Sequence, residues 1–162
     1  MSLCLVVESC LLACTTGTWC VDTGATNHVC NSLKGIQETK RLAEREIYLL
    51  MGDTSHMAAV IVGVVTLHFE GGKKLVLSDC LYVPSVRRNL VSVSYLSCNG
   101  YSSLFNKDSI FIKYRDDIIC HDILLDNLYL LEPISLQINS HESNHKRKEI
   151  FPINQPIFGT LD

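Results

Sequence analysis

The chain has 162 residues, of which 47% are hydrophobic and 19% are charged, and its formal net charge is -3. This length and composition suit one domain with a substantial core. The slightly acidic balance argues against a protein that binds nucleic acid over its whole surface, and no run reaches the roughly 18 apolar residues of a membrane span.

The first third of the chain predicts short strands separated by loops. Residues 1–17 are apolar, but they lack the basic start of a signal peptide and are interrupted at Glu8 and Ser9. A strand is expected at 18–22, and a short strand or turn at 27–31. The charged stretch 31–44 predicts a surface loop with one helical turn. The following elements are a strand at 46–51 and a turn at 52–55.

The remainder of the domain predicts further strands and one helix. A long β-branched strand is expected at 57–69, with a bend at Gly63, and a hairpin turn at 70–73 leads to a return strand at 74–83. Apolar residues then change to helical spacing over 86–99, where Asn99 and Gly100 provide a stop signal. The last strands are expected at 101–105, 110–114, 118–124 and 128–131. The pattern predicts a mostly β domain, closed or nearly closed, with one short helix.

The end of the chain changes in composition. From Ser135 it is polar and then proline-bearing, and its basic cluster at 146–148 is typical of a solvated linker. We therefore expect an N-terminal extension at 1–17, a β domain at 18–133, and a disordered linker or tail at 134–162.

Eight cysteines are many for this length, but no CxxC pair occurs among them. Most lie in apolar runs, which favours buried free thiols in a reducing compartment over a disulfide framework. His28 and Cys30, near Cys20, also raise the alternative of metal ligands. Packing is the favoured interpretation, because no fourth ligand has a suitable spacing. We expect neither a metal nor another cofactor.

The run Trp19-Cys20-Val21-Asp22-Thr23-Gly24-Ala25 is the most informative motif. An aspartate closes an apolar strand and is followed by a hydroxyl residue, a glycine and a small residue. A glycine lets the backbone approach closely and can offer its N–H to a carboxylate. An aspartic protease needs this arrangement, although Asp-Thr-Gly alone is also an ordinary turn after a strand.

Further motifs follow in an order that resembles the protease region of Ty1/copia-type retrotransposon Pol polyproteins. The motif extends to His28, in a pattern similar to W-x-[LV]-D-[ST]-G-A-[ST]-x-H of that family. The turn Gly52-Asp53-Thr54 is similar to its short G-D-G turn. The later matches are Leu77-Ser-Asp-Cys-Leu-Tyr-Val-Pro84, Arg88-Asn-Leu-Val-Ser-Val-Ser-Tyr-Leu96 and Asn127-Leu-Tyr-Leu-Leu131. The resemblance covers about Thr18 to Glu132 and rests on all of these pieces together.

The resemblance implies a retropepsin-like closed β-barrel. Such chains carry one Asp-Thr-Gly loop each, so two copies must pair about a two-fold axis to bring two aspartates together. Asp22-Thr23-Gly24 indeed occurs once in the sequence. The resemblance makes Asp22 the catalytic carboxylate, with Thr23 as a clamp across the dimer axis, Gly24 as a backbone donor and Ala25 as a small residue that leaves room for substrate.

Two other features near the expected site have competing interpretations. The turn Gly52, Asp53, Thr54, Ser55 could close over a peptide as a flap, or it could be a plain hairpin turn. For His28 we favour a hydrogen-bonded structural histidine over a general base, because no serine or cysteine is placed to be activated by it. Asp53 and Asp79 are interpreted as turn and strand-end residues.

The sequence therefore predicts an aspartic endopeptidase that cleaves a Gag-Pol polyprotein as a homodimer, in the cytoplasm or within a virus-like particle. Its partners would be a polypeptide substrate and a second copy, with no membrane and no nucleic acid. Two alternatives remain. One is a truncated, inactive β-barrel remnant, and the other is a thiol- or metal-binding module that uses the cysteines.

Overall fold

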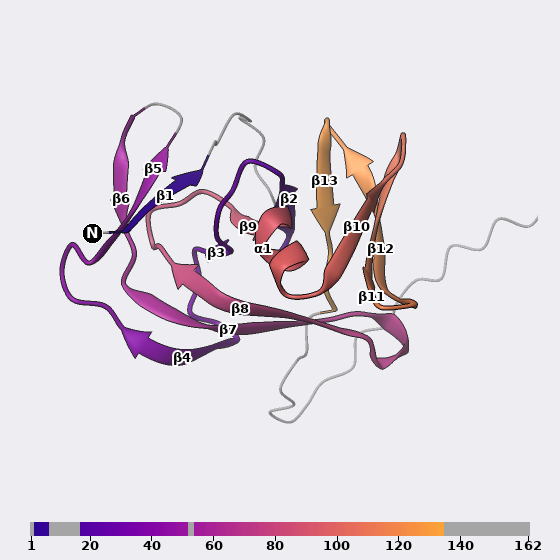
Figure 1. Ribbon diagram of the computed structural model, residues 1–162, viewed down its shortest axis with the longest axis horizontal. Helices are drawn as coiled ribbons and strands as arrows, with labels where there is room; N and C mark the ends of the chain where they lie inside the picture. The colour runs from indigo at the N-terminus through magenta and orange to yellow at the C-terminus, as the bar shows by residue number, and fades with distance from the viewer. Residues whose placement is uncertain (1, 7–16, 52–53, 135–162) are drawn as a thin grey trace, which may run out of the picture.

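The computed structural model of the protein describes residues 2–6, 17–51 and 54–134 (Figure 1). This part of the chain is mostly β, as predicted, with one short α-helix. The elements along the chain are β1 Ser2–Val6, β2 Trp19–Asp22, β3 Val29–Cys30, β4 Ile36–Arg41, β5 Ile47–Met51, β6 His56–Ala58, β7 Ile61–His68, the 3-10 turn η1 Glu70–Gly72, β8 Lys74–Tyr82, β9 Asn89–Ser92, α1 Val93–Cys98, β10 Tyr101–Phe105, β11 Ser109–Tyr114, β12 Asp117–Leu125 and β13 Leu128–Leu131.

The strands form one large sheet and one small sheet. The large sheet has ten strands in the order β10-β11-β12-β13-β2-β9-β3-β8-β7-β4, and the small sheet has the order β1-β5-β6. Figure 1 shows the long β7–β8 hairpin running along the lower part of the molecule, with β4 on its outer side. In the part of the chain that the structure describes, no ladder joins β10 to β4. The predicted closure of the barrel is therefore not confirmed.

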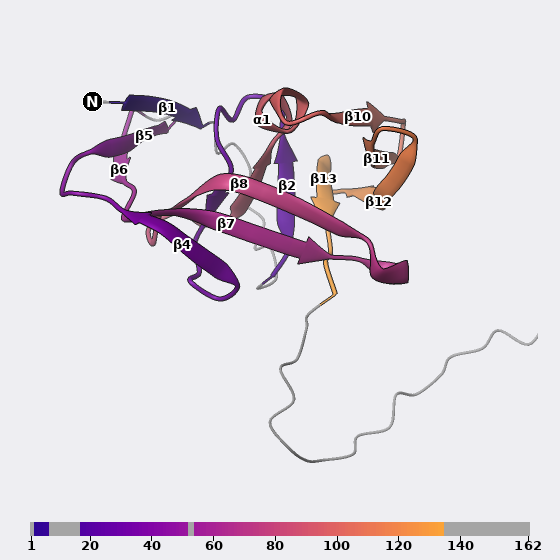
Figure 2. The same cartoon turned by 60° about the horizontal axis from the view of Figure 1, so that its bottom comes forward.

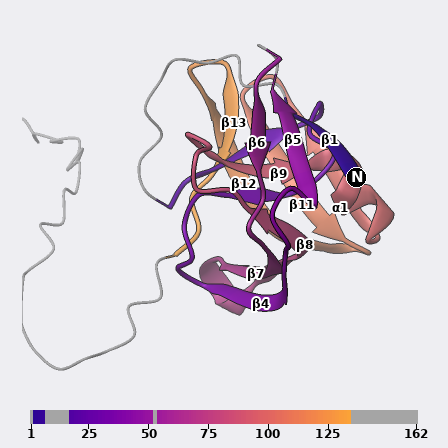
Figure 3. The same cartoon turned by 90° about the vertical axis from the view of Figure 1, so that its left-hand side faces the viewer.

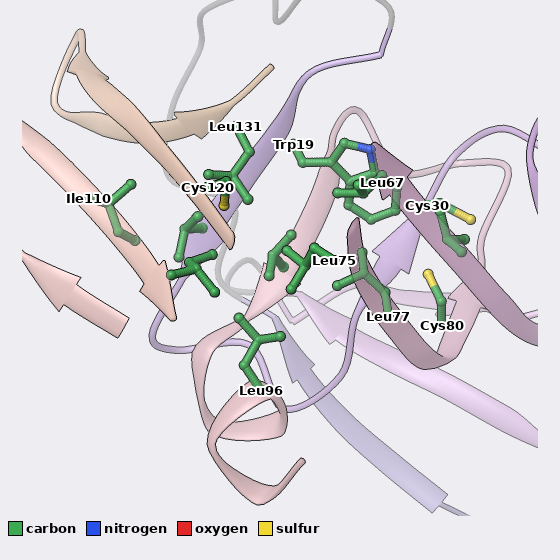
Figure 4. Packing of buried hydrophobic residues seen from close by; sticks show 14 residues of the cluster. Trp19, Cys30, Leu67, Leu75, Leu77, Cys80, Leu96, Ile110, Cys120 and Leu131 are labelled. Atoms are coloured by element: carbon green, nitrogen blue, oxygen red, sulfur yellow. The ribbon is translucent and has the colours of Figure 1, made fainter. Parts of the chain in front are cut away.

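The main core lies inside the curve of the large sheet. It brings Leu75 of β8 together with Ile110 of β11, although these strands lie far apart in the sheet order. Figure 4 shows such side chains converging from several strands and from Leu96 of α1. Burying a large aliphatic side chain contributes roughly 1.5–3 kcal/mol, so this cluster supplies much of the stability of the fold.

A second core lies between the large sheet and the small sheet. Leu49 of β5 and Leu90 of β9 belong to it, together with Val29 and Leu81 from the paired strands β3 and β8. Figure 3, which views the molecule from the side of the small sheet, shows β5 and β6 standing against the larger one. The small sheet is thus packed onto the strands that surround Asp22.

The expectation of a loop at 31–44 is wrong, because residues 36–41 form strand β4. This strand pairs antiparallel with β7 at the edge of the sheet, and all of its residues except Ile36 are exposed. An edge strand with charged side chains shows no alternation of apolar residues. The pairing brings the backbone of β4 close to Gly63, where an added Cβ would lie 2.5 Å from the carbonyl oxygen of Gln37.

Two segments that the sequence predicts as single elements each form two elements in the structure. The single strand expected at 57–69 is broken between β6 and β7, which belong to different sheets. A register shift follows Gly63, at the predicted bend. The helical spacing over 86–99 covers a strand first, β9, and only then the six-residue helix α1. Strand β9 is buried at every position, so an apolar run there fits either structure.

Strand β1 is not among the predicted elements, because residues 1–17 are expected only as an extension. The remaining strands lie where the sequence predicts them, and β10 and β13 match the predicted bounds. Most of the N-terminal extension and all of the tail from residue 135 lie outside the described residues, so the domain boundaries stay a prediction. Within the described ranges, no helix is long and apolar enough to cross a membrane.

Candidate active site

Three strands of the large sheet position Asp22. Strand β9 lies between β2 and β3, parallel to β2 and antiparallel to β3. The register pairs Asp22, the last residue of β2, with Ser92, the last residue of β9. Figure 2 shows β2 running toward α1, and β9 leads directly into that helix. The loop from Thr23 to His28 therefore leaves on one side of β9 and returns on the other.

The predicted site residues form one compact loop. Asp22 is half-buried, and its Oδ1 accepts a hydrogen bond from the backbone N–H of Gly24 at 2.7 Å. Thr23 and Gly24 are exposed, whereas Ala25 is buried. This geometry orients the carboxylate toward its own loop and agrees with the backbone-donor role expected of Gly24. The expected clamp by Thr23 needs a second chain and stays a prediction.

Ser92 holds the far side of this loop. Its Oγ donates a 2.6 Å hydrogen bond to the carbonyl oxygen of Ala25, and the Oγ of Ser94 reaches the same oxygen at 3.3 Å. The Ser92 Oγ also accepts from the backbone N–H of Tyr95 at 3.1 Å, which makes Ser92 the N-cap of α1. One buried hydroxyl thus joins the helix start to the Asp22 loop.

His28 ends the loop inside the protein. Its side chain is only 1% exposed, and its Nδ1 accepts the backbone N–H of Ser92 at 3.0 Å. Burial lowers the pKa of His28 from 6.5 to about 4, against an opposing effect of the Asp79 charge. The histidine is therefore buried, neutral and hydrogen-bonded at neutral pH, as the structural interpretation predicts.

Asp79 and Tyr95 lie beside His28. The Tyr95 ring makes an edge contact with the imidazole, with 5.1 Å between the ring centroids. The Tyr95 hydroxyl donates to the Asp79 carboxylate. Burial, followed by that hydrogen bond, raises the pKa of Tyr95 to about 12. Asp79 lies within β8 rather than at a strand end as predicted, and its carboxylate is bound by the Tyr95 hydroxyl.

Asn89, at the start of β9, is a supporting residue that belongs to the motif at 88–96 but whose role the motif does not indicate. Its Oδ1 accepts the backbone N–H of Asn31 at 3.0 Å, and its Nδ2 donates to the carbonyl oxygen of Thr18 at 3.2 Å. These bonds join the start of β2 to the end of β3. Ser92 and Asn89 are polar residues inside an otherwise apolar run, and this signal could have marked both as buried hydrogen-bonding residues.

The proposed flap lies partly outside the described residues. Gly52 and Asp53 are not described, whereas Thr54 adopts a left-handed conformation with φ 68°. The N–H of Met51 donates to the carbonyl oxygen of Ser55 at 2.9 Å, so the segment closes the β5–β6 hairpin. A hairpin turn is confirmed here, and its function as a flap stays a prediction.

An open pocket of about 580 Å³ lies beside this hairpin. It is lined by Arg45, Glu46, Tyr48 and His56. None of Asp22, Thr23, Gly24 or Ala25 lines it, so this pocket and the Asp22 loop are separate features.

None of the cysteines that the structure describes with their side chains forms a disulfide. Cys20, Cys30, Cys80 and Cys120 are buried, and Cys98 is exposed. A hydrogen bond between thiols joins Cys30 and Cys80, and it lowers the pKa of Cys30. In the described ranges no group of three or more His, Cys, Asp or Glu side chains is placed to hold a metal. The burial of Cys20, Cys30, Cys80 and Cys120 agrees with the packing interpretation, whereas the exposed Cys98 does not.

Comparisons with known proteins agree with the family resemblance that the motifs indicate. Residues 19–101 match the family model described as "Pol polyprotein, beta-barrel domain". The chain is also 31% identical, over 118 residues, to the "Retrovirus-related Pol polyprotein from transposon TNT 1-94" of Nicotiana tabacum. That match covers 68% of this chain but only 8% of the tobacco protein. No solved structure matches. The chain therefore belongs to the beta-barrel domain family of copia-type retrotransposon Pol polyproteins.

Proposed function

We propose that the chain is an aspartic endopeptidase that cleaves a Gag-Pol polyprotein as a homodimer, with Asp22 as the catalytic carboxylate of each copy. The observation that carries this proposal is the geometry of the Asp22 loop. The carboxylate sits at the end of a buried strand, is oriented by the Gly24 N–H at 2.7 Å, and is followed by two exposed residues. A half-buried carboxylate at a strand end, beside two exposed residues, can meet a substrate and a second copy.

The chemistry requires two such carboxylates. Two carboxyl groups held roughly 3 Å apart share one proton, because both cannot ionise at modest cost. The ionised partner acts as a general base on a bridging water, and the protonated partner polarises the scissile carbonyl. The roles then reverse as the leaving amine takes its proton. One chain offers Asp22 alone in an Asp-Thr-Gly motif, so a second copy supplies the partner.

The proposal also covers the barrel fold, the form of the substrate, the flap and the cellular location. We infer a retropepsin-like barrel, supported by the main core, to which strands β8 and β11 both contribute although they are distant in the sheet order. The substrate is an extended peptide whose side chains enter alternate pockets. The turn after Met51 acts as the flap, and the enzyme works in the cytoplasm or within a virus-like particle.

The test is cleavage of a peptide library by the purified chain between about pH 4 and pH 7. The Asp22→Asn variant is compared with Asp116→Asn, which changes an exposed aspartate in the β11–β12 turn. We expect the wild type and Asp116→Asn to cut the same peptides, whereas Asp22→Asn loses at least a hundredfold of the cleavage rate. The loss follows because an amide cannot act as the general base.

Three results would contradict the proposal. A folded wild-type chain that sediments as a monomer and cuts no peptide would be an inactive barrel remnant. Stoichiometric metal in the purified protein would favour the thiol- or metal-binding module. Cleavage that survives Asp22→Asn would assign the activity to another site or to a contaminant.

A further inference from the structure

We propose that His28 and Ser92 form a clasp that holds the Asp22 loop in its working position, with His28 as a positioning residue rather than a base. The clasp is defined by the bond from the Ser92 N–H to His28 Nδ1 and the bond from Ser92 Oγ to the Ala25 carbonyl oxygen. Its catalytic consequence rests on the proposed protease function, whereas its existence can be tested without any substrate.

The first argument is the placement of the two bonds. Ser92 pairs with Asp22 across the β2–β9 ladder, so it is already fixed beside the carboxylate by the sheet. From this one residue, the side chain holds Ala25 at 2.6 Å and the backbone holds His28 at 3.0 Å. The loop between Asp22 and His28 is thereby attached at its start, its middle and its end.

The second argument is burial. Ala25 and His28 are each 1% exposed, and Ser92 is fully buried. Water cannot replace a lost bond in such a position, so a missing acceptor leaves the Ser92 N–H unpaired inside the protein. The loop would have to move to satisfy it, and Asp22 would move with the loop.

The third argument concerns the protonation state of the ring. An Nδ1 that accepts a bond must carry no hydrogen, so the ring is the neutral form with its hydrogen on Nε2. A protonated ring would turn a second donor toward the Ser92 N–H and open the clasp. The groups that face the ring are Tyr95 of α1 and Asp79 of β8, and Asp79 accepts the Tyr95 hydroxyl.

The geometry also argues against His28 as a base. The group that reaches its Nδ1 is a backbone amide, which is not a nucleophile in this chemistry. The Ser92 hydroxyl points instead to Ala25, Ser94 and Tyr95. A ring that is 1% exposed cannot take a proton from a bound peptide directly.

The first test compares two substitutions of His28. In His28→Asn the side-chain oxygen can take the place of Nδ1 as an acceptor without titrating, whereas His28→Phe keeps an aromatic ring and removes the acceptor. We expect His28→Phe to lower kcat about 10- to 100-fold with little change in KM, because misplacing a catalytic group costs rates of this order. His28→Asn should restore kcat and remove the contribution of His28 to the acid limb of the pH profile.

The matched control is His121, which is exposed and stacks on Phe111 with 4.2 Å between the ring centroids. The substitutions His121→Asn and His121→Phe should leave kcat, KM and the acid limb unchanged. Unchanged kcat in a folded His28→Phe variant would overturn the proposal. So would an acid limb in His28→Asn that is identical to that of the wild type.

The second test needs neither activity nor a variant. Nitrogen-15 NMR of the wild-type chain near neutral pH should show a neutral His28 with a bare Nδ1 and a hydrogen on Nε2, and a slowly exchanging Ser92 amide. A hydrogen on Nδ1, or a rapidly exchanging Ser92 amide, would overturn the clasp. If the wild type cleaves no peptide, the proposed function fails, and this measurement still decides the clasp independently.

Discussion

At the scale of single residues, the buried polar side chains near Asp22 matter most, because they form the hydrogen bonds that fix the Asp22 loop. His28 is predictable from the sequence as a structural histidine, because no nucleophile has a suitable spacing from it. Its partner is not predictable, since the amide of Ser92 lies 64 residues further along the chain. The same holds for Ser92 and Ala25, whose contact depends on the pairing of β2 with β9. The sequence therefore predicts Asp22 as a site residue, whereas the hydrogen-bond partners of its loop are found only in the folded structure.

Burial of His28 makes the stability of the protein depend on pH. The folded-state pKa of about 4 lies below the ordinary value of 6.5, so the unfolded chain binds more protons between these two values. The stabilisation is thus complete above pH 6.5 and is lost as the pH falls toward 4. Chemical denaturation should show a loss on the order of 2–3 kcal/mol across this range from His28 alone.

The His28→Asn variant isolates this contribution from that of the carboxylates, which also titrate in acid. We expect the free energy of unfolding of the variant to depend less on pH than that of the wild type over this window. Parallel curves for the two proteins would show that His28 takes up its proton as easily in the folded protein as in the unfolded one.

At the scale of secondary-structure elements, patterns of apolar residues predict some strands correctly and fail for others. The hairpins of β10 to β13 have clear turns and half-buried alternation, and their positions agree with the prediction. Strand β4 was missed because its side chains are exposed and charged. Strand β9 was assigned to the helix because every residue in it is buried, which removes the alternation that separates a strand from a helix.

Strand β4 can be tested through the glycine that it covers. A Cβ at Gly63 would lie 2.5 Å from the carbonyl oxygen of Gln37 and 2.6 Å from Ile36 Cγ1. Because backbone lies on one side of it, Gly63→Ala should lower the free energy of unfolding by at least about 1–3 kcal/mol. Equilibrium denaturation measures the change.

Gly72→Ala is the matched control, because nothing lies within 4 Å of its added Cβ and its φ is +73°. It should cost about 1–2 kcal/mol, from the left-handed conformation alone. A Gly63→Ala variant as stable as the wild type would mean that β4 does not lie against Gly63 in solution.

At the scale of the whole molecule, the sheet encloses one core but the described residues do not close it into a barrel. The family identity and the mostly β fold follow from the sequence, because several family motifs occur in it in the expected order. Closure of the barrel and dimer formation cannot be predicted from these motifs, since both depend on strand edges and surfaces that no motif specifies. The proposed mechanism nevertheless requires two chains, because each chain has a single Asp-Thr-Gly motif and supplies one carboxylate.

Mixing wild-type chains with Asp22→Asn chains tests most directly whether activity requires two Asp22 carboxylates. At a fixed wild-type concentration, high enough for pairing, a ninefold excess of the variant should draw most wild-type chains into mixed dimers with one carboxylate. Random pairing then lowers the peptide-cleaving activity per wild-type chain roughly tenfold, whereas the same excess of Asp116→Asn does not lower it. Activity that is unaffected by the Asp22→Asn chains would show that each chain works alone, and the account of a shared pair of Asp22 carboxylates would be wrong.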